Sequence, residues 1–128
     1  MSALSNYLET KLIDHVLRNA SYTSPATVYA ALYTTDPGED NSGTEVSGGD
    51  YARQSVTFGA PTDGVTKNSV EVTYPEATAS WGTVSYTGIL DANTGGNLLF
   101  YGGLDASKTV DTGDQFIFQI DELECSLD

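Results

Sequence analysis

The residue types that most often carry out catalysis are sparse in this sequence. It contains one histidine, His15, and one cysteine, Cys125. Nucleophilic catalysis needs a base beside a serine or cysteine, but His15 falls within a helical pattern and Cys125 in the last predicted strand. A single cysteine also excludes an intramolecular disulfide and a cysteine-cluster metal site. We therefore expect no catalytic residue, no cofactor and no enzymatic activity.

Acidic residues are plentiful, with 18 Asp and Glu. A carboxylate pair can hydrolyse glycosides, but most of these acids lie in turn-forming stretches, where Asp tightens the backbone. The best candidate for a ligand-binding group is Asp36, Glu39, Asp40 and Asn41. Its oxygens suit Ca²⁺, although the stretch lacks the closing Glu of an EF-hand loop. We predict an exposed acidic loop with no metal ion, and calcium binding is the alternative.

The overall charge restricts the partners of the protein. The formal net charge is -13 in 128 residues, and residues 1–19 contribute nothing to it, because two acids there balance two bases. Binding to nucleic acid or to an anionic membrane requires clustered cations. The cations are instead scattered along the chain, at Lys11, Arg18, Arg53, Lys67 and Lys108. No apolar run approaches the roughly 18 residues that span a membrane. We expect neither nucleic acid nor membrane as a partner.

The elements that position these residues begin with one helix. Between residues 3 and 19 the apolar residues recur every three to four positions, at Leu4, Leu8, Leu12, Ile13, Val16 and Leu17. This spacing predicts an amphipathic helix, with Ser2 or Ser5 as its cap. The apolar stripe either packs on the rest of the chain or docks onto another protein, and the pattern fits both.

After Pro25 the apolar period changes to two, which indicates strands. We predict strands at residues 28–33, 53–58, 69–74, 82–90, 97–102, 115–120 and 122–127, and a long exposed loop at 35–50. Short strands separated by Gly and Asp turns are typical of an antiparallel β-sandwich, here jelly-roll-like. The prediction is one structural domain, with a helix in residues 1–20 and a sandwich in residues 21–128.

Protein contact is the function that this composition favours. Eight tyrosines accompany a single tryptophan, and tyrosine suits surfaces that are apolar at one end and wet at the other. The predicted contact residues lie on the helix: Tyr7, Leu8, Lys11, Leu12, His15 and Arg18.

Three stretches of the sequence, residues 12–61, 77–104 and 108–118, resemble a family of small virion proteins of tailed phages, often labelled tail fibre proteins. The most specific pieces are residues 24–36, 51–58 and 81–100. The resemblance implies a structural virion protein made in the host cytoplasm. By analogy with small β-sandwich proteins of phage heads, we expect a homotrimer that decorates or cements the outer surface of the head by binding the major capsid protein. The alternative is a tail or tail-fibre component that contacts the host surface through residues 36–50.

Overall fold

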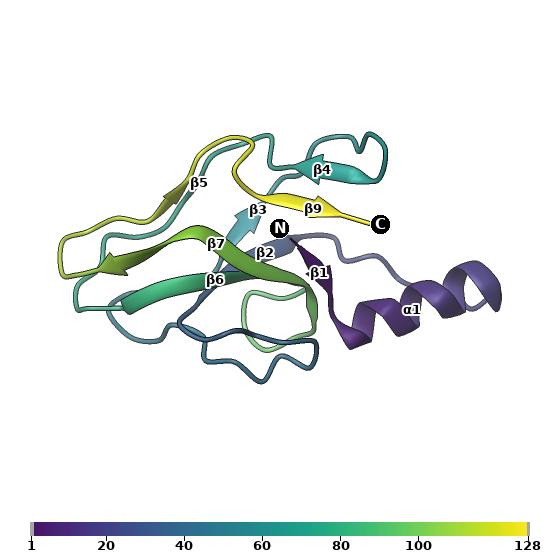
Figure 1. Cartoon of the computed structure of the whole chain (residues 1–128), viewed down its shortest axis with the longest axis horizontal. Coiled ribbons are helices and arrows are strands. Elements are labelled where there is room, and N and C mark those ends of the chain that lie inside the picture. Colours follow the sequence, from purple (N-terminus) through teal and green to yellow (C-terminus); the bar gives the residue numbers. More distant parts are fainter. Residues whose placement is uncertain (1, 128) are drawn as a thin grey trace.

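The computed structural model describes residues 2–127, which form a mainly β structure with one helix near the N-terminus (Figure 1). The largest sheet is antiparallel, in the order β1 (Ala3–Leu4), β7 (Leu98–Val110), β6 (Gly82–Leu90), β2 (Val28–Tyr33) and β3 (Gln54–Val56). The helix α1 (Asn6–Leu17) lies between β1 and β2 in the chain.

Two short antiparallel pairs form a second layer over one face of this sheet. β4 (Val65–Lys67) pairs with β9 (Glu124–Ser126), and β5 (Val72–Thr73) pairs with β8 (Ile117–Phe118). The main core fills the space between the layers, with Leu32 and Val84 on the large sheet and Phe118 and Leu123 opposite. The predicted mainly β, sandwich-like architecture with a leading helix is therefore confirmed.

The strands with the clearest alternation match their predicted bounds. β2 and β6 begin and end as expected, because each alternates between two packed faces of the sheet. β7 is longer than predicted, since Gly102 and Gly103 pair with Thr87 and Tyr86 instead of forming a turn. β4 was not predicted, and the strands expected at residues 53–58, 69–74, 115–120 and 122–127 are shorter in the structure.

The helix begins later than the apolar pattern predicts. Ala3 and Leu4 pair with Tyr101 and Phe100 as an edge strand, so the helical turns start only after Ser5. The side chain of Ser5 accepts a hydrogen bond from the backbone N–H of Leu8 (3.2 Å), which makes it the cap. Within residues 2–127, no helix combines the length and apolar character needed to span a membrane.

The predicted loop at 35–50 is only partly exposed. Pro37 and Val46 are buried, and Glu45 forms an antiparallel bridge with Tyr33 at the end of β2. The hydroxyl of Tyr33 donates to Oδ1 of Asn41 (2.8 Å). The loop is therefore attached to the large sheet, because a chain that leaves β2 and turns back can satisfy its backbone against that strand.

A buried asparagine joins the two short pairs of the second layer. Nδ2 of Asn68 donates to the carbonyls of Val70 and Gln119 (both 2.9 Å), and its Oδ1 accepts from the N–H of Leu123 (2.9 Å).

Leaving a buried polar group without a hydrogen-bond partner costs about 1–3 kcal/mol of stability. We expect Asn68→Ala to lower the free energy of unfolding by about 3 kcal/mol, measured by urea unfolding with the fluorescence of the buried Trp81. The exposed Asn93→Ala is the control, and equal stability of both variants would contradict this role.

Candidate functional site

The helix α1 is held at its first turn and projects away from the β body (Figure 1). The hydroxyl of Ser5 donates to the carbonyl of Leu98, and its backbone N–H donates to the carbonyl of Leu99 (2.9 Å). The N–H of Asn6 donates to the carbonyl of Glu39 (2.9 Å). These bonds fix the start of α1 on β7 and on the loop that follows β2.

The apolar stripe of α1 divides along its length. Leu8, in the first turn, is 6% exposed, whereas Ile13, Val16 and Leu17 are 55%, 71% and 76% exposed. The first turn therefore packs on the chain's own body, and the last two turns present apolar side chains to solvent. Of the two roles that the sequence left open for the stripe, packing on the rest of the chain applies to the first turn, and docking onto another protein stays a prediction for the outer turns.

The predicted contact residues are distributed over both parts. Leu8 is buried, and Tyr7 and Leu12 are half-buried. Three are exposed and interact locally: Lys11 lies over the ring of Tyr7 (5.7 Å), Nδ1 of His15 is 3.0 Å from the Ala20 carbonyl, and Arg18 pairs with Asp14 (3.2 Å). The most exposed apolar residues of α1, Ile13, Val16 and Leu17, were not among them. The apolar spacing correctly predicted that these three residues lie on the helix. It could not show how far the helix extends beyond the β body.

The acidic loop lies beside the first turn of α1. Asp36, Glu39, Asp40 and Asn41 are all exposed, as predicted. A crevice of about 270 Å³ brings the two predicted sets together, since Tyr7 from the helix and the last three loop residues line it. Desolvation, followed by the charges of Glu39 and Asp36, raises the pKa of Tyr101 nearby. Acidic side chains of the loop therefore lie beside the first turn of α1.

The loop residues make hydrogen bonds within their own loop and to the end of β2. Oδ1 of Asp36 accepts from the N–H of Gly38 (2.9 Å), and Oδ1 of Asn41 accepts from Tyr33. Among residues 2–127, the structure brings together no group of three or more His, Cys, Asp or Glu side chains able to hold a metal ion.

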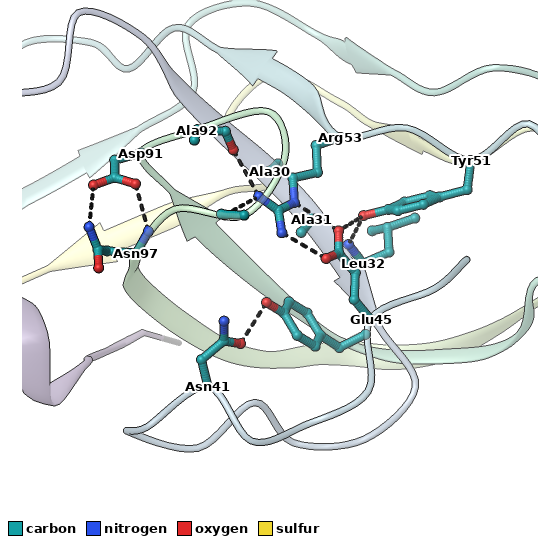
Figure 2. A network of polar contacts seen from close by, with 12 residues as sticks. Ala30, Ala31, Leu32, Asn41, Glu45, Tyr51, Arg53, Asp91, Ala92 and Asn97 are labelled. Atoms are coloured by element: carbon teal, nitrogen blue, oxygen red, sulfur yellow. Dashed lines mark hydrogen bonds and ion pairs between the residues drawn. The ribbon is translucent and has the colours of Figure 1, made fainter. Parts of the chain in front are cut away.

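A partly buried ion pair between Arg53 and Glu45 holds the loops around β2, and sequence reasoning missed it. Figure 2 shows Arg53 between Glu45 and the turn that contains Ala92. Nε and Nη2 of Arg53 donate to the two carboxylate oxygens of Glu45 (2.9 and 2.8 Å). Nη1 donates to the carbonyls of Ala92 and Gly95 (both 2.8 Å). The side chains of Arg53 and Glu45 are 9% and 25% exposed, so this pair connects three segments largely out of contact with water.

Tyr51 extends the network to the sheet. Its hydroxyl donates to Oε2 of Glu45 (2.7 Å) and accepts from the N–H of Leu32 in β2 (3.0 Å). The turn itself is closed by Asp91, which accepts from the backbone and side-chain nitrogens of Asn97 (2.7 and 3.0 Å; Figure 2). The polar atoms of this network bind the protein's own segments, so its role is to fix the loops.

The buried tyrosines make the fold sensitive to alkali. Burial raises the pKa of Tyr33 from 10.0 to about 12, and it also raises the pKa of Tyr51 and Tyr74. Above pH 10 the unfolded chain therefore loses protons that the folded chain keeps, and stability falls as the pH rises. We expect the free energy of unfolding to decline between pH 10 and 12, with a shallower decline in Tyr33→Phe. Urea unfolding across this range measures it, and identical slopes would contradict the assignment.

An apolar groove lies at the end of the body where β9 terminates. It has a volume of about 430 Å³ and is lined by Val28, Phe58, Pro61, Gly64, Thr66, Ile89, Leu99, Phe100, Cys125, Ser126 and Leu127. None of these described lining residues carries a charge. Cys125 is buried in this wall, and burial raises the pKa of its thiol to about 12. Among the described residues, the groove and the outer half of α1 both present apolar side chains at this end of the body.

Comparison with known proteins places these features in a family. Residues 3–126 match the family model described as Podophage GP4 fiber I protein gp80. A search of the curated proteins found no match. The matched region runs from the first residue of β1 to the last residue of β9 and includes α1. The resemblance to phage virion structural proteins is thereby confirmed, and the chain belongs to this family of phage fibre proteins.

Proposed function

We propose that this chain is a structural, non-enzymatic component of a phage fibre and that it is attached to its neighbours through the outer half of α1. The observation that carries the proposal is the exposure of Ile13, Val16 and Leu17 on a helix that projects from the body. Contiguous exposed apolar side chains mark interaction surfaces. Their spacing places them on one helical face, the arrangement with which a helix enters an apolar groove.

The distribution of charge supports α1 as the attachment point. Residues 1–19 have no net charge, whereas the remaining residues carry the full -13. Two acidic bodies repel each other, but a neutral helix approaches an acidic or neutral surface without that cost. The helix is therefore the part of this chain that meets another virion protein with the least electrostatic opposition.

The cations favour protein partners over nucleic acid. Phosphate binding requires basic side chains that gather on one surface. Here each of the five has a neighbour within the chain: Lys11 with Tyr7, Arg18 with Asp14, Arg53 with Glu45, Lys67 with Glu124 and Lys108 with Phe116. These contacts support a protein partner over nucleic acid or an anionic membrane.

Copy number separates a fibre component from a head decoration protein bound to the major capsid protein. The family description favours the fibre, which predicts few copies per particle. Quantitative mass spectrometry of purified particles gives the ratio of this chain to the major capsid protein. A ratio far below one supports a fibre component. A ratio close to one would overturn that proposal in favour of decoration of the head.

Attachment through α1 is tested by incorporation into particles. The chain is supplied from a plasmid during infection by a phage that lacks its own copy. We expect the double variant Val16→Asp with Leu17→Asp to be lost from purified particles. Val70→Asp is the matched control, because Val70 is a 54% exposed apolar residue outside α1, and it should be incorporated normally. Incorporation of the double variant at the wild-type level would refute attachment through the helix.

A further inference from the structure

We propose that the apolar groove receives the outer half of α1 from a second copy of this chain. This inference deepens the proposed function, on which it rests, by naming one partner of the helix. It starts from two complementary surfaces on one molecule. One is the helical face of Ile13, Val16 and Leu17, and the other is the uncharged groove between β4, β9 and the large sheet.

The groove has the size and lining of a binding site. Its volume of about 430 Å³ lies within the roughly 300–1,000 Å³ of pockets that bury ligands. Phe58, Ile89 and Phe100 contribute apolar walls, and Leu127 stands at its edge with about half of its surface exposed. Aliphatic side chains that enter this space would be removed from water against a mostly apolar, uncharged lining.

The helix does not fill the groove of its own chain. Its start is fixed by the bonds of Ser5 to Leu98 and Leu99 and of Asn6 to Glu39. From this point the helix extends outward, and its last two turns remain exposed (Figure 1). A helix of 12 residues is about 18 Å long, which is enough to reach a neighbouring body. One contact between two copies would therefore bury the exposed helix face of one copy and fill the groove of the other.

Charge favours this pairing over a basic partner. The described groove lining is uncharged, and the helix segment has no net charge although the body carries -13. A strongly basic partner would gain more from the acidic surface elsewhere than from this groove. A neutral apolar helix is matched to an uncharged apolar groove, and the chain itself contains such a helix.

The area required for a stable interface implies exchange. Specific interfaces bury about 1,200–2,000 Å², and one face of three aliphatic residues falls short of that on its own. A stable assembly would therefore need more than one such helix-in-groove contact. In a closed ring or a two-fold pair each copy gives its helix and receives another, so every added copy adds a full contact.

The mass of the full chain in solution tests the pairing. Sedimentation equilibrium should show an oligomer for the wild type and a monomer for Val16→Asp with Leu17→Asp. Leu127→Arg places a charge at the groove edge and should also give a monomer, whereas Val70→Asp should keep the wild-type mass. A monomeric wild type, or an unchanged mass in Leu127→Arg, would overturn the proposal.

The native thiol provides a test of the geometry. In Val16→Cys, mild oxidation should form a disulfide to Cys125 of another copy, visible as a covalent oligomer on a non-reducing gel. The linkage should disappear in Val16→Cys with Cys125→Ser. Linkage that survives in this double variant, or a disulfide within one chain, would overturn helix-in-groove exchange. The two proposals can be told apart. If the wild type is a monomer but the helix variant is still lost from particles, attachment through α1 is supported and only the pairing with a second copy is refuted.

Discussion

Replacing Arg53 by alanine should lower the free energy of unfolding by about 2–3 kcal/mol, because the partly buried carboxylate of Glu45 loses its charged partner. The loss leaves the carboxylate of Glu45 without its two charge-assisted bonds and the carbonyls of Ala92 and Gly95 without donors. In a domain of this size the melting temperature should fall by roughly 10 °C. Thermal unfolding followed by circular dichroism measures it.

Two variants show whether geometry or charge is responsible. Arg53→Lys keeps the charge, but a single ammonium cannot reach both carboxylate oxygens and both carbonyls, so we expect an intermediate loss. Lys67→Ala breaks a 3.8 Å pair with Glu124 between side chains that are 47% and 39% exposed, and it should cost less than about 1 kcal/mol. If Arg53→Ala were as stable as Lys67→Ala, the network would not be what holds the loops.

The second large effect distinguishes the two parts of α1. Leu8→Asp should destabilise the protein by about 3 kcal/mol, because it places an unpaired carboxylate in a site that is 6% exposed. The position lies in the first helical turn, where an acid favours the helix dipole. The loss therefore reports packing against the body and not helix propensity. Urea unfolding measures it.

Val16→Asp is the matched variant in the outer half. Because Val16 is 71% exposed, the free energy of unfolding of this variant should stay within about 0.5 kcal/mol of the wild type, and adding Leu17→Asp should abolish particle attachment. Comparable destabilisation by both variants would show that the outer turns also pack on the body. That result would remove the basis for the proposed function.

The elements that were predicted correctly are those whose local pattern and tertiary environment agree. β2 and β6 alternate through the centre of the large sheet, so their period alone marks their ends. Leu4 fits the helical stripe equally well, yet a cap at Ser5 and an open edge of β7 place it in a strand. Local spacing cannot reveal an open edge elsewhere in the fold.

The candidate site was predictable only in part, for similar reasons. The exposed loop at Asp36 and Asn41 follows from composition, because turn residues without apolar period stay in solvent. The pairing of Arg53 with Glu45 depends on how two loops fold back on β2. Gly103 resembles a turn residue, but in the sheet it lies opposite the ring of Tyr86. Each of these outcomes depends on contacts between distant segments.

The position of β1 has a mechanical consequence. Because α1 lies between β1 and β2 in the chain, it is joined covalently at both ends to strands of the same sheet. A force applied to the helix is divided between the edge, where β1 pairs with β7, and the interior, where β2 is paired on both sides. Detachment of the two-residue edge strand would therefore leave the tether to β2 intact.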